Sequence, residues 1–232
     1  MGVSMGDGVD WPAYYRKEAE ISDFDPAQGD EAEVLRCEAA WSVFPPEQAG
    51  SMLDVGCGEG HFCGWVKDRG GPRRVVGLDI SRTRLERARS RRPGVHFVEG
   101  QITHMPFGES AFDVVTCVEV LEHMESPSRV LAECARVAGR WVVVTVPDGE
   151  RLRRALCPHC LRTFPLDGHL ASFDRTALEG LAQDCGLRVE CLTTYRRPVV
   201  GMPRPLGAAV RRLQSLLFPA PGLYLAARMR KG

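Results

Sequence analysis

The stretch "SMLDVGCGEGHF" (residues 51–62) decides the fold of this chain. Its first residues are typical of a buried strand, and Gly56, Gly58 and Gly60 follow that strand at once. The apolar pattern after the glycines predicts a helix from about His61 to Asp68. Glycines permit a tight turn and a close approach of the backbone to a ligand, and the amino end of the following helix favours an anion. The stretch therefore predicts a strand, a ligand-binding turn and a helix.

Strand and helix patterns alternate from this stretch onward. Strands are predicted over 73–80, 95–100, 111–117 and 140–147, and helices over 81–91 and 126–138, with Ser81 and Ser126 as their N-caps. Val-rich, near-continuous apolar strands between helices are typical of a parallel sheet that is covered on both faces. A further helix over 173–186 and two late strands over 187–195 and 222–230 are predicted to complete an antiparallel edge. The fold class is therefore α/β and Rossmann-like.

The chain divides into four parts. Residues 1–50 are predicted to form N-terminal helices that cap the site, 51–147 the cofactor-binding core, 148–173 an insertion with a C-x-x-C motif, and 174–232 the completion of the core. The last part contains an insertion at 196–219. This insertion is either a helix packed on the sheet edge or a lid over the ligand-binding site. Loops after the strand ends carry the site in an open α/β sheet, and long ones form lids or substrate walls.

The composition is that of an ordinary globular domain. The 232 residues are 44% apolar and 26% charged with a formal net charge of +0, so no global field attracts nucleic acid or a membrane surface. No apolar run approaches the ~20 residues of a membrane helix, and the acidic, Gly-rich start does not resemble a signal peptide. Nine cysteines without such a signal predict a reducing, cytoplasmic location.

A carboxylate follows the second strand of the predicted sheet. Asp79 lies 19 residues after Gly60, where an acid can accept hydrogen bonds from ribose hydroxyls. The glycine turn and this acid together predict a cofactor that contains a nucleoside. The spacing G-x-G-x-G, with Asp54 two residues before the first glycine, disfavours the dinucleotide fingerprint G-x-G-x-x-G of dehydrogenases.

Four segments carry a more specific resemblance. "LDVGCGEG", "VVGLDIS", "FVEGQITHMPFGESAFDVV" and "CVEVLEHM", in this order and spacing, resemble the class I S-adenosylmethionine-dependent methyltransferases, in particular the ubiquinone-pathway O-methyltransferases of the type 11 group. The resemblance covers about 51–147 and implies a seven-stranded, mostly parallel sheet with an antiparallel last strand. It also implies that S-adenosylmethionine is held by Asp54, Gly56, Cys57, Gly58, Gly60, Asp79, Ile80, Gln101, Ile102 and Cys117.

The resemblance assigns parts of the cofactor to some of these residues. The glycine loop would wrap its methionine end, with Asp54 near the ammonium group. Asp79 would hold the ribose, Ile80 would pack on the adenine, and Gln101 would read the adenine amino group.

The motif E-x-x-E-H follows the strand "FDVV". Its residues Glu119, Glu122 and His123 have a spacing that predicts one face of a helix. Three interpretations stay open. His123, assisted by Glu119, is a general base; or Glu119, Glu122 and His123 bind a divalent metal together with His169; or these are ordinary helix residues. The metal interpretation is implied by a resemblance to the 2′-O-methyltransferases that act on small-RNA 3′ ends.

The motif "CPHC" (residues 157–160) offers a second metal site. C-x-x-C is the knuckle of many zinc sites, and Cys157, Cys160 and His169 could form a structural zinc centre. Tetrahedral closure needs two ligands beyond the knuckle, and such a centre would compete with the first site for His169. Cys185 and Cys191 are the remaining nearby thiols.

These patterns together predict an S-adenosylmethionine-dependent methyltransferase that methylates a hydroxyl of a small molecule, such as a secondary metabolite, a glycan precursor or a phenol. The cofactor is S-adenosylmethionine, with a divalent metal (Mg or Zn) as an addition. Two alternatives are a metal-dependent RNA ribose 2′-O-methyltransferase and a non-catalytic S-adenosylmethionine-binding partner of another enzyme. We expect a monomer or homodimer with a small-molecule acceptor and no membrane span, and the low aromatic content disfavours nucleic acid.

Overall fold

The computed structural model describes residues 9–21, 31–45, 49–196 and 223–231. The predicted lid-like insertion at 196–219 lies outside these residues except for Arg196. No helix in the described ranges combines the length and apolarity needed to cross a membrane.

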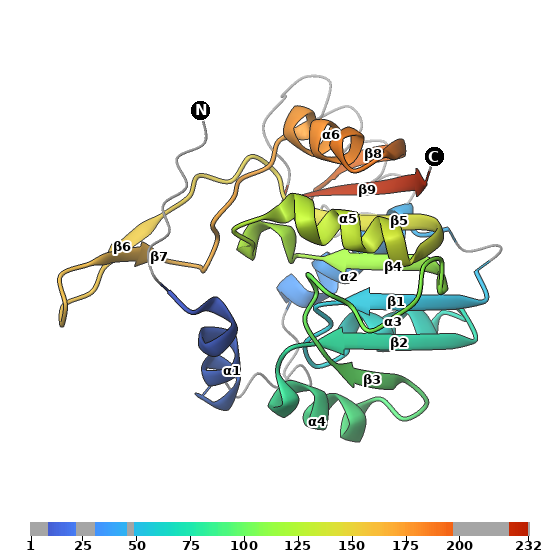
Figure 1. The fold of residues 1–232 in the computed structure, drawn as a ribbon, viewed down its shortest axis with the longest axis horizontal. Coiled ribbons are helices and arrows are strands. Elements are labelled where there is room, and N and C mark those ends of the chain that lie inside the picture. The colour runs from blue at the N-terminus through green and yellow to red at the C-terminus, as the bar shows by residue number, and fades with distance from the viewer. Residues whose placement is uncertain (1–8, 22–30, 46–48, 197–222, 232) are drawn as a thin grey trace, which may run out of the picture.

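Seven strands form one mixed sheet in the order β3-β2-β1-β4-β5-β9-β8 (Figure 1). The strands are β1 (Ser51–Val55), β2 (Arg74–Asp79), β3 (His96–Glu99), β4 (Phe112–Val118), β5 (Ala138–Pro147), β8 (Leu187–Tyr195) and β9 (Tyr224–Lys231). β1 to β5 pair in parallel, whereas β9, the last strand in the chain, runs antiparallel to both β5 and β8. The predicted fold class, including the antiparallel last strand, is confirmed.

In the described part of the chain, six α-helices lie around this sheet. They are α1 (Trp11–Ile21), α2 (Glu31–Val43), α3 (His61–Asp68), α4 (Arg82–Arg91), α5 (Pro127–Val137) and α6 (Arg175–Asp184). The predicted N-cap of α4 is present, because the Ser81 hydroxyl accepts a hydrogen bond from the Arg84 N–H at 3.3 Å. Ser126 occupies the N-cap position of α5, but its side chain makes no capping hydrogen bond. Pro127 is the first residue of that helix.

Two apolar cores lie on the two faces of the sheet. One is formed by α5 and α6 against the sheet, with Leu131 and Leu178 fully buried in it. The other is formed by α2, α3 and α4, with Phe62 and Leu85 buried in it. Since successive side chains of a strand point to opposite faces, Val143 of β5 belongs to the second core and Val144 to the first. This double coverage explains why the strands are apolar along most of their length.

A small hairpin projects from this body. Its strands β6 (Arg154–Leu156) and β7 (Thr163–Pro165) pair only with each other in the described structure, and Figure 1 shows them away from the main sheet. The hairpin belongs to the predicted insertion at 148–173, and the C-x-x-C motif occupies its turn.

Candidate functional site

A cavity of about 610 Å³ lies at the carboxyl ends of the central strands. It is lined by residues that follow β1, β2 and β4 and by the inner side of α1. Its lining includes Gly56, Asp79, Ile80, Gln101, Glu119 and His123. This size lies within the range of small-molecule sites, and the strand ends at the crossover are where open α/β sheets bind ligands.

The glycine loop closes on the neighbouring strand. The N–H groups of Gly56 and Cys57 both donate to the Leu78 carbonyl, at 2.8 and 3.0 Å. Gly56, Gly58 and Gly60 have φ values of 70°, 52° and 73°, in the left-handed region that disfavours other residues. A Cβ on Gly56 would lie 2.7 Å from Val120, whereas a Cβ on Gly58 would meet no protein atom within 4 Å. The loop thus leaves free space beside Gly58 for another molecule.

The Asp79 carboxylate is fixed at the mouth of the cavity. Its Oδ2 accepts the Gly58 N–H and its Oδ1 accepts the Ser81 N–H, both at 2.8 Å. Each oxygen keeps a second lone pair, so the carboxylate can still accept hydrogen bonds from a ligand. This arrangement suits vicinal ribose hydroxyls, and Ile80, Gln101 and Ile102 line the cavity beside it.

Five of the residues predicted to hold the cofactor are not among those that line this cavity: Asp54, Cys57, Gly58, Gly60 and Cys117. The Asp54 carboxylate points into the protein and accepts hydrogen bonds from the Thr116 hydroxyl at 2.6 Å and the Cys63 thiol at 3.4 Å. Its burial raises its pKa to about 7. Cys117 is fully buried in the core that contains α5, so its thiol is unavailable to a ligand.

The E-x-x-E-H segment is not the helix that its spacing predicts. β4 ends at Val118, and Glu119 has a φ of 53°, which a helix does not accept. A single 3₁₀ turn, Leu121–His123, follows. Glu119 and His123 both line the cavity, while Glu122 is turned inward and only 1% exposed. The three side chains therefore do not share one helix face, because Glu119 has a left-handed backbone and lies outside the 3₁₀ turn.

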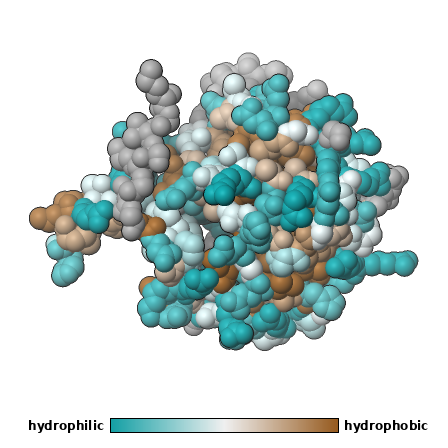
Figure 2. Space-filling model, viewed as in Figure 1, coloured by the Kyte–Doolittle hydropathy of each residue, from teal (hydrophilic) through white to brown (hydrophobic). Residues whose placement is uncertain are grey.

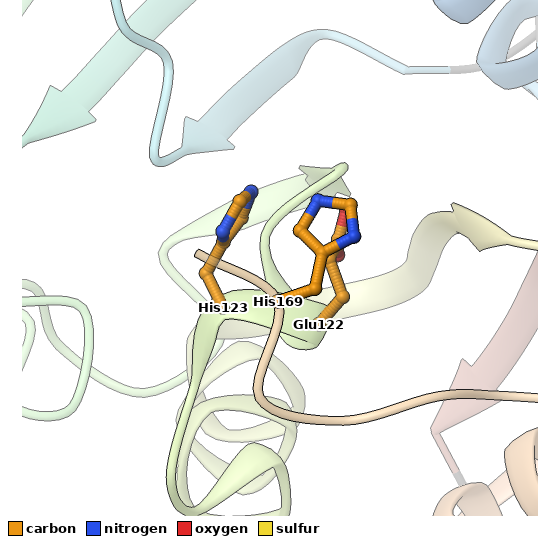
Figure 3. Close-up of side chains that lie close together, drawn as sticks. All are labelled: Glu122, His123 and His169. Atoms are coloured by element: carbon orange, nitrogen blue, oxygen red, sulfur yellow. The ribbon is translucent and has the colours of Figure 1, made fainter. Parts of the chain in front are cut away.

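Glu122, His123 and His169 form a cluster (Figure 3), and their potential ligand atoms all lie within 4.8 Å of one another. The segment that carries His169 is held there by the backbone, since the N–H groups of Leu170 and Ala171 donate to the Glu122 carbonyl at 2.6 and 3.0 Å. Both carboxylate oxygens of Glu122 are buried and have no hydrogen-bond partner in the described structure. A buried carboxylate in that state is costly unless a cation or a proton completes it.

Both imidazoles of this cluster have a second partner that orients them. His123 Nδ1 lies 3.2 Å from the Gly168 carbonyl, and His169 Nδ1 contacts the Glu150 carboxylate. A carbonyl and a carboxylate are acceptors, so each Nδ1 carries the proton and each Nε2 offers a lone pair. Metal-binding histidines characteristically have such partners. Burial, with the neighbouring His169, lowers the pKa of His123 to about 4, which keeps the ring neutral as a ligand must be.

Glu119, the fourth predicted metal ligand, is not part of this cluster. Its carboxylate lies near Thr145 and Arg36, and burial raises its pKa to about 8. Because it lines the cavity beside His123, it can contact a bound molecule. The structure thus brings together three of the four predicted ligands.

The alternative zinc set is not brought together. His169 belongs to the cluster with Glu122 and His123, whereas Cys157 and Cys160 lie in the turn of the projecting hairpin. Cys185 ends α6, where its thiol donates to the Ser128 carbonyl at 3.5 Å, and Cys191 lies in β8. The structure therefore does not bring Cys157, Cys160 and His169 together into one group of potential ligands.

Sequence reasoning missed individual residues of the site. The N-terminal helices were predicted to cap the site, but Tyr15 of α1, whose ring lies 5.8 Å from the His123 ring, and Glu18, which pairs with Arg84 of α4, were not singled out. Glu150, which positions His169, was also missed. An acid just after the last core strand was the only signal for Glu150.

Comparison with known proteins gives a family match at the core. Residues 53–140 match the family of methyltransferase domains. A Mycolicibacterium smegmatis protein named a probable S-adenosylmethionine-dependent methyltransferase is 30% identical over 60% of this chain and 52% of its own length. The ubiquinone biosynthesis O-methyltransferase of Hahella chejuensis is 41% identical over 38% of each chain. The chain thus spans about half or less of the length of these curated relatives.

A solved structure with the same fold covers nearly the whole chain. It is a chain of the Haloferax volcanii complex between the Trm112 methyltransferase activator and a methyltransferase, with a TM-score of 0.67 and 18% identity over 93% of this chain and 96% of that one. At that identity the likeness concerns the fold alone.

Proposed function

We propose that this chain, a class I S-adenosylmethionine-dependent methyltransferase whose methyltransferase domain spans residues 53–140, transfers a methyl group to a hydroxyl of a small molecule with the help of a divalent cation. One observation carries the choice of chemistry. Glu122, His123 and His169 place three potential ligand atoms within 4.8 Å at the edge of the cavity, with two oriented imidazoles and one buried carboxylate that has no protein partner.

The residues that would hold S-adenosylmethionine are those around the glycine loop and β2. Asp79, fixed by two backbone N–H groups, would accept hydrogen bonds from the ribose hydroxyls, and Ile80 and Gln101 would contact the adenine. The methionine end would lie against the glycine loop, where a Cβ on Gly58 would meet no protein atom within 4 Å. The cofactor supplies an electrophilic methyl group on sulfur, so the protein has only to align the acceptor, exclude water and manage one proton.

Glu122, His123 and His169 would hold the cation. A divalent ion at such a site lowers the pKa of a bound hydroxyl and fixes its orientation. The ligand types, two nitrogens and a carboxylate with open positions, suit Mn²⁺, Fe²⁺ or Zn²⁺ better than Mg²⁺, which prefers oxygen ligands. Glu119 also lines the cavity, and because burial raises its pKa to about 8, its ionised form is a strong enough base to accept the proton that the hydroxyl loses.

The metal-free alternative makes His123 the general base. Its Nε2 is available, but a pKa near 4 makes the ring a weak proton acceptor at neutral pH. The same cluster also supports the second candidate function, 2′-O-methylation of an RNA ribose, since a ribose hydroxyl can be activated in the same way. The ubiquinone-pathway relative, which its name describes as an O-methyltransferase, favours the small-molecule acceptor.

Calorimetric titration with S-adenosylhomocysteine tests the cofactor site. The wild-type chain should bind it, and Gly58→Val should not, because the added side chain would occupy the space beside the loop. Gly70→Val is the matched control, since Gly70 also has a left-handed φ, 71°, and no atom within 4 Å of its Cβ, but lies after α3, away from the cavity. If titration of the wild-type chain with S-adenosylhomocysteine gives no heat, the assignment of the cofactor is wrong.

Binding of Mn²⁺, followed by electron paramagnetic resonance, tests the metal site without any need for activity. Glu122→Gln and His169→Ala should each lose the bound ion. Methyl transfer to a panel of phenols, aliphatic alcohols and a short RNA with a free 3′ end then identifies the acceptor. If activity survives complete metal removal but is lost in His123→Ala, the reaction needs no metal and His123 takes the proton directly.

A further inference from the structure

We propose that the hairpin turn at Cys157 and Cys160 is half of a zinc site, and that the same turn of a second copy of this chain completes it. Each copy would supply two thiolates, and the four sulfurs would surround one zinc ion on a two-fold axis. This site is separate from the cavity and independent of the proposed methyl transfer.

The turn already has the local geometry of a zinc knuckle. The Cys157 N–H donates to the Arg162 carbonyl and the Leu161 N–H to the Cys157 carbonyl, both at 2.9 Å, which closes a compact loop around the two thiols. Both thiols therefore lie in one short turn, as the two ligands of a zinc knuckle do.

No third ligand lies beside this pair among the residues that the structure describes. All nine cysteines and all six histidines lie within the described residues. In that part of the chain the only group of three or more potential ligands is Glu122, His123 and His169. His159 lies between the two cysteines within the same turn, and His169 is bound to Glu150. Structural zinc sites are almost always four-coordinate, and the described residues supply two ligands, so we assign the other two to a second copy of the chain.

A second copy also covers what the hairpin leaves exposed. Two-stranded hairpins are marginal in water on their own, and the sheet of β6 and β7 has no third strand in the described structure. Apolar side chains gather on this arm, as Figure 2 shows in brown, including Leu156, Leu161 and Phe164, of which Leu161 is 72% exposed. An exposed apolar patch beside an incomplete metal site fits an interface between identical hairpins.

Charge makes this association depend on the metal. Over residues 150–167, Arg151, Arg153, Arg154 and Arg162 outnumber Glu150 and Asp167, and Arg153 is paired with Asp167. The net charge of this segment is thus positive, so two metal-free hairpins repel each other weakly. Zinc bound by four thiolates carries a net charge of about −2, which attracts the arginines of both copies. We therefore expect monomers without zinc and dimers with it.

Zinc content and mass, measured on the full chain by elemental analysis and light scattering, test the proposal. The expected result is a dimer in which a zinc ion bound by thiolates is shared by two chains, a monomer after chelation, and a dimer again when zinc is restored. The variant Cys157→Ser/Cys160→Ser should stay monomeric. Cys185→Ser/Cys191→Ser, which changes the two other partly exposed cysteines, is the matched control and should dimerise like the wild type.

Cobalt substitution separates this site from the cluster at the cavity. Thiolate ligands give an intense near-ultraviolet charge-transfer band with Co²⁺ that imidazole and carboxylate ligands lack, so the band counts hairpin sites alone. Saturation at one cobalt per two chains supports the proposal. Saturation at one per monomer, no thiolate band, or a dimer that persists in Cys157→Ser/Cys160→Ser would each overturn it.

Discussion

The Nδ1 atom of His123 lies 3.2 Å from the carbonyl oxygen of Gly168. This contact ties the turn after β4 to a segment 45 residues later in the chain and places the proton of His123 on Nδ1. Nε2 is then left to act as a ligand or a base. The insertion at 148–173 therefore supplies functional groups to the site. They are the His169 imidazole, the Gly168 carbonyl oxygen that contacts His123, and the Glu150 carboxylate that orients His169.

Replacement of Glu122 by methionine should stabilise the metal-free protein. The Glu122 carboxylate is buried with neither oxygen bonded, and removal of such a group recovers about 1–3 kcal/mol. Mn²⁺ should raise the free energy of unfolding of the wild type but not of Glu122→Met. Urea unfolding in chelator and in Mn²⁺ measures both effects.

Leu121→Met is the matched control for this change, since Leu121 is the fully buried neighbour in the same turn. It should lose less than about 1.5 kcal/mol and keep the response to Mn²⁺. A Glu122→Met variant that is less stable than the wild type in chelator would show that the carboxylate has a partner in the metal-free protein.

The Glu150 carboxylate should control metal affinity without touching the metal. Glu150→Gln keeps the shape of the side chain but weakens the acceptor that orients His169, and loss of such a partner typically weakens binding by about 10–100-fold. The dissociation constant for Mn²⁺, measured by calorimetry, checks this. Glu179→Gln, at an exposed carboxylate paired with Arg175, should bind like the wild type. If the wild type, Glu150→Gln and Glu179→Gln bind Mn²⁺ with equal affinity, Glu150 does not support the metal site.

The ion pair between Glu18 and Arg84 should hold α1 over the cavity. Both side chains are about a quarter exposed, and the pair joins α1 to α4. Arg84→Ala should therefore speed hydrogen exchange of α1 up to about fivefold, which corresponds to the ~1 kcal/mol of a partly exposed pair, and leave the sheet unchanged. Lys17→Ala, which removes a pair within α1 itself, is the control. Unaltered exchange in Arg84→Ala would mean that aromatic packing alone seats the helix.

Much of the sheet could be predicted from local pattern, for physical reasons that particular residues show. The strands are apolar on both sides because both faces are buried, and Ser81 marks a helix start because its side chain accepts a backbone N–H group. Asp79 could be placed at a strand end because it directly follows an apolar run that reads as a buried strand. These features depend on interactions within a few residues.

The site was less predictable because it depends on contacts that are distant in sequence. The helical spacing of Glu119 and Glu122 was misleading, since Glu119 has a left-handed backbone that a helix does not accept, and nothing in the spacing signals it. Asp54 was assigned to the cofactor, but the hydroxyl of Thr116, 62 residues away, turns its carboxylate inward. Pattern reasoning identified the residue types of the site but not their orientation.

Asp54 should make the stability of the fold depend on pH. Its folded pKa, about 7, lies above the ordinary value of 3.8 because the carboxyl is buried. Between these values the folded chain holds a proton that the unfolded chain has lost. Stability therefore falls as the pH rises from about 4 to about 7 and changes no further above that on account of this group. From pH 5 to pH 7 the loss is on the order of 2–3 kcal/mol.

Asp54→Asn should reduce this dependence, because the amide does not titrate and its oxygen can still accept the Thr116 hydroxyl. Urea unfolding at pH 5, 6, 7 and 8 checks it, as the difference between wild type and variant isolates Asp54 from the other titrating groups. Thr116→Val provides the opposite control. It removes a donor that lowers the pKa of Asp54, so its stability should continue to fall above pH 7. If wild type and Asp54→Asn lose stability in parallel across this range, the carboxyl is ionised in the folded protein and the Thr116 and Cys63 hydrogen bonds outweigh its burial.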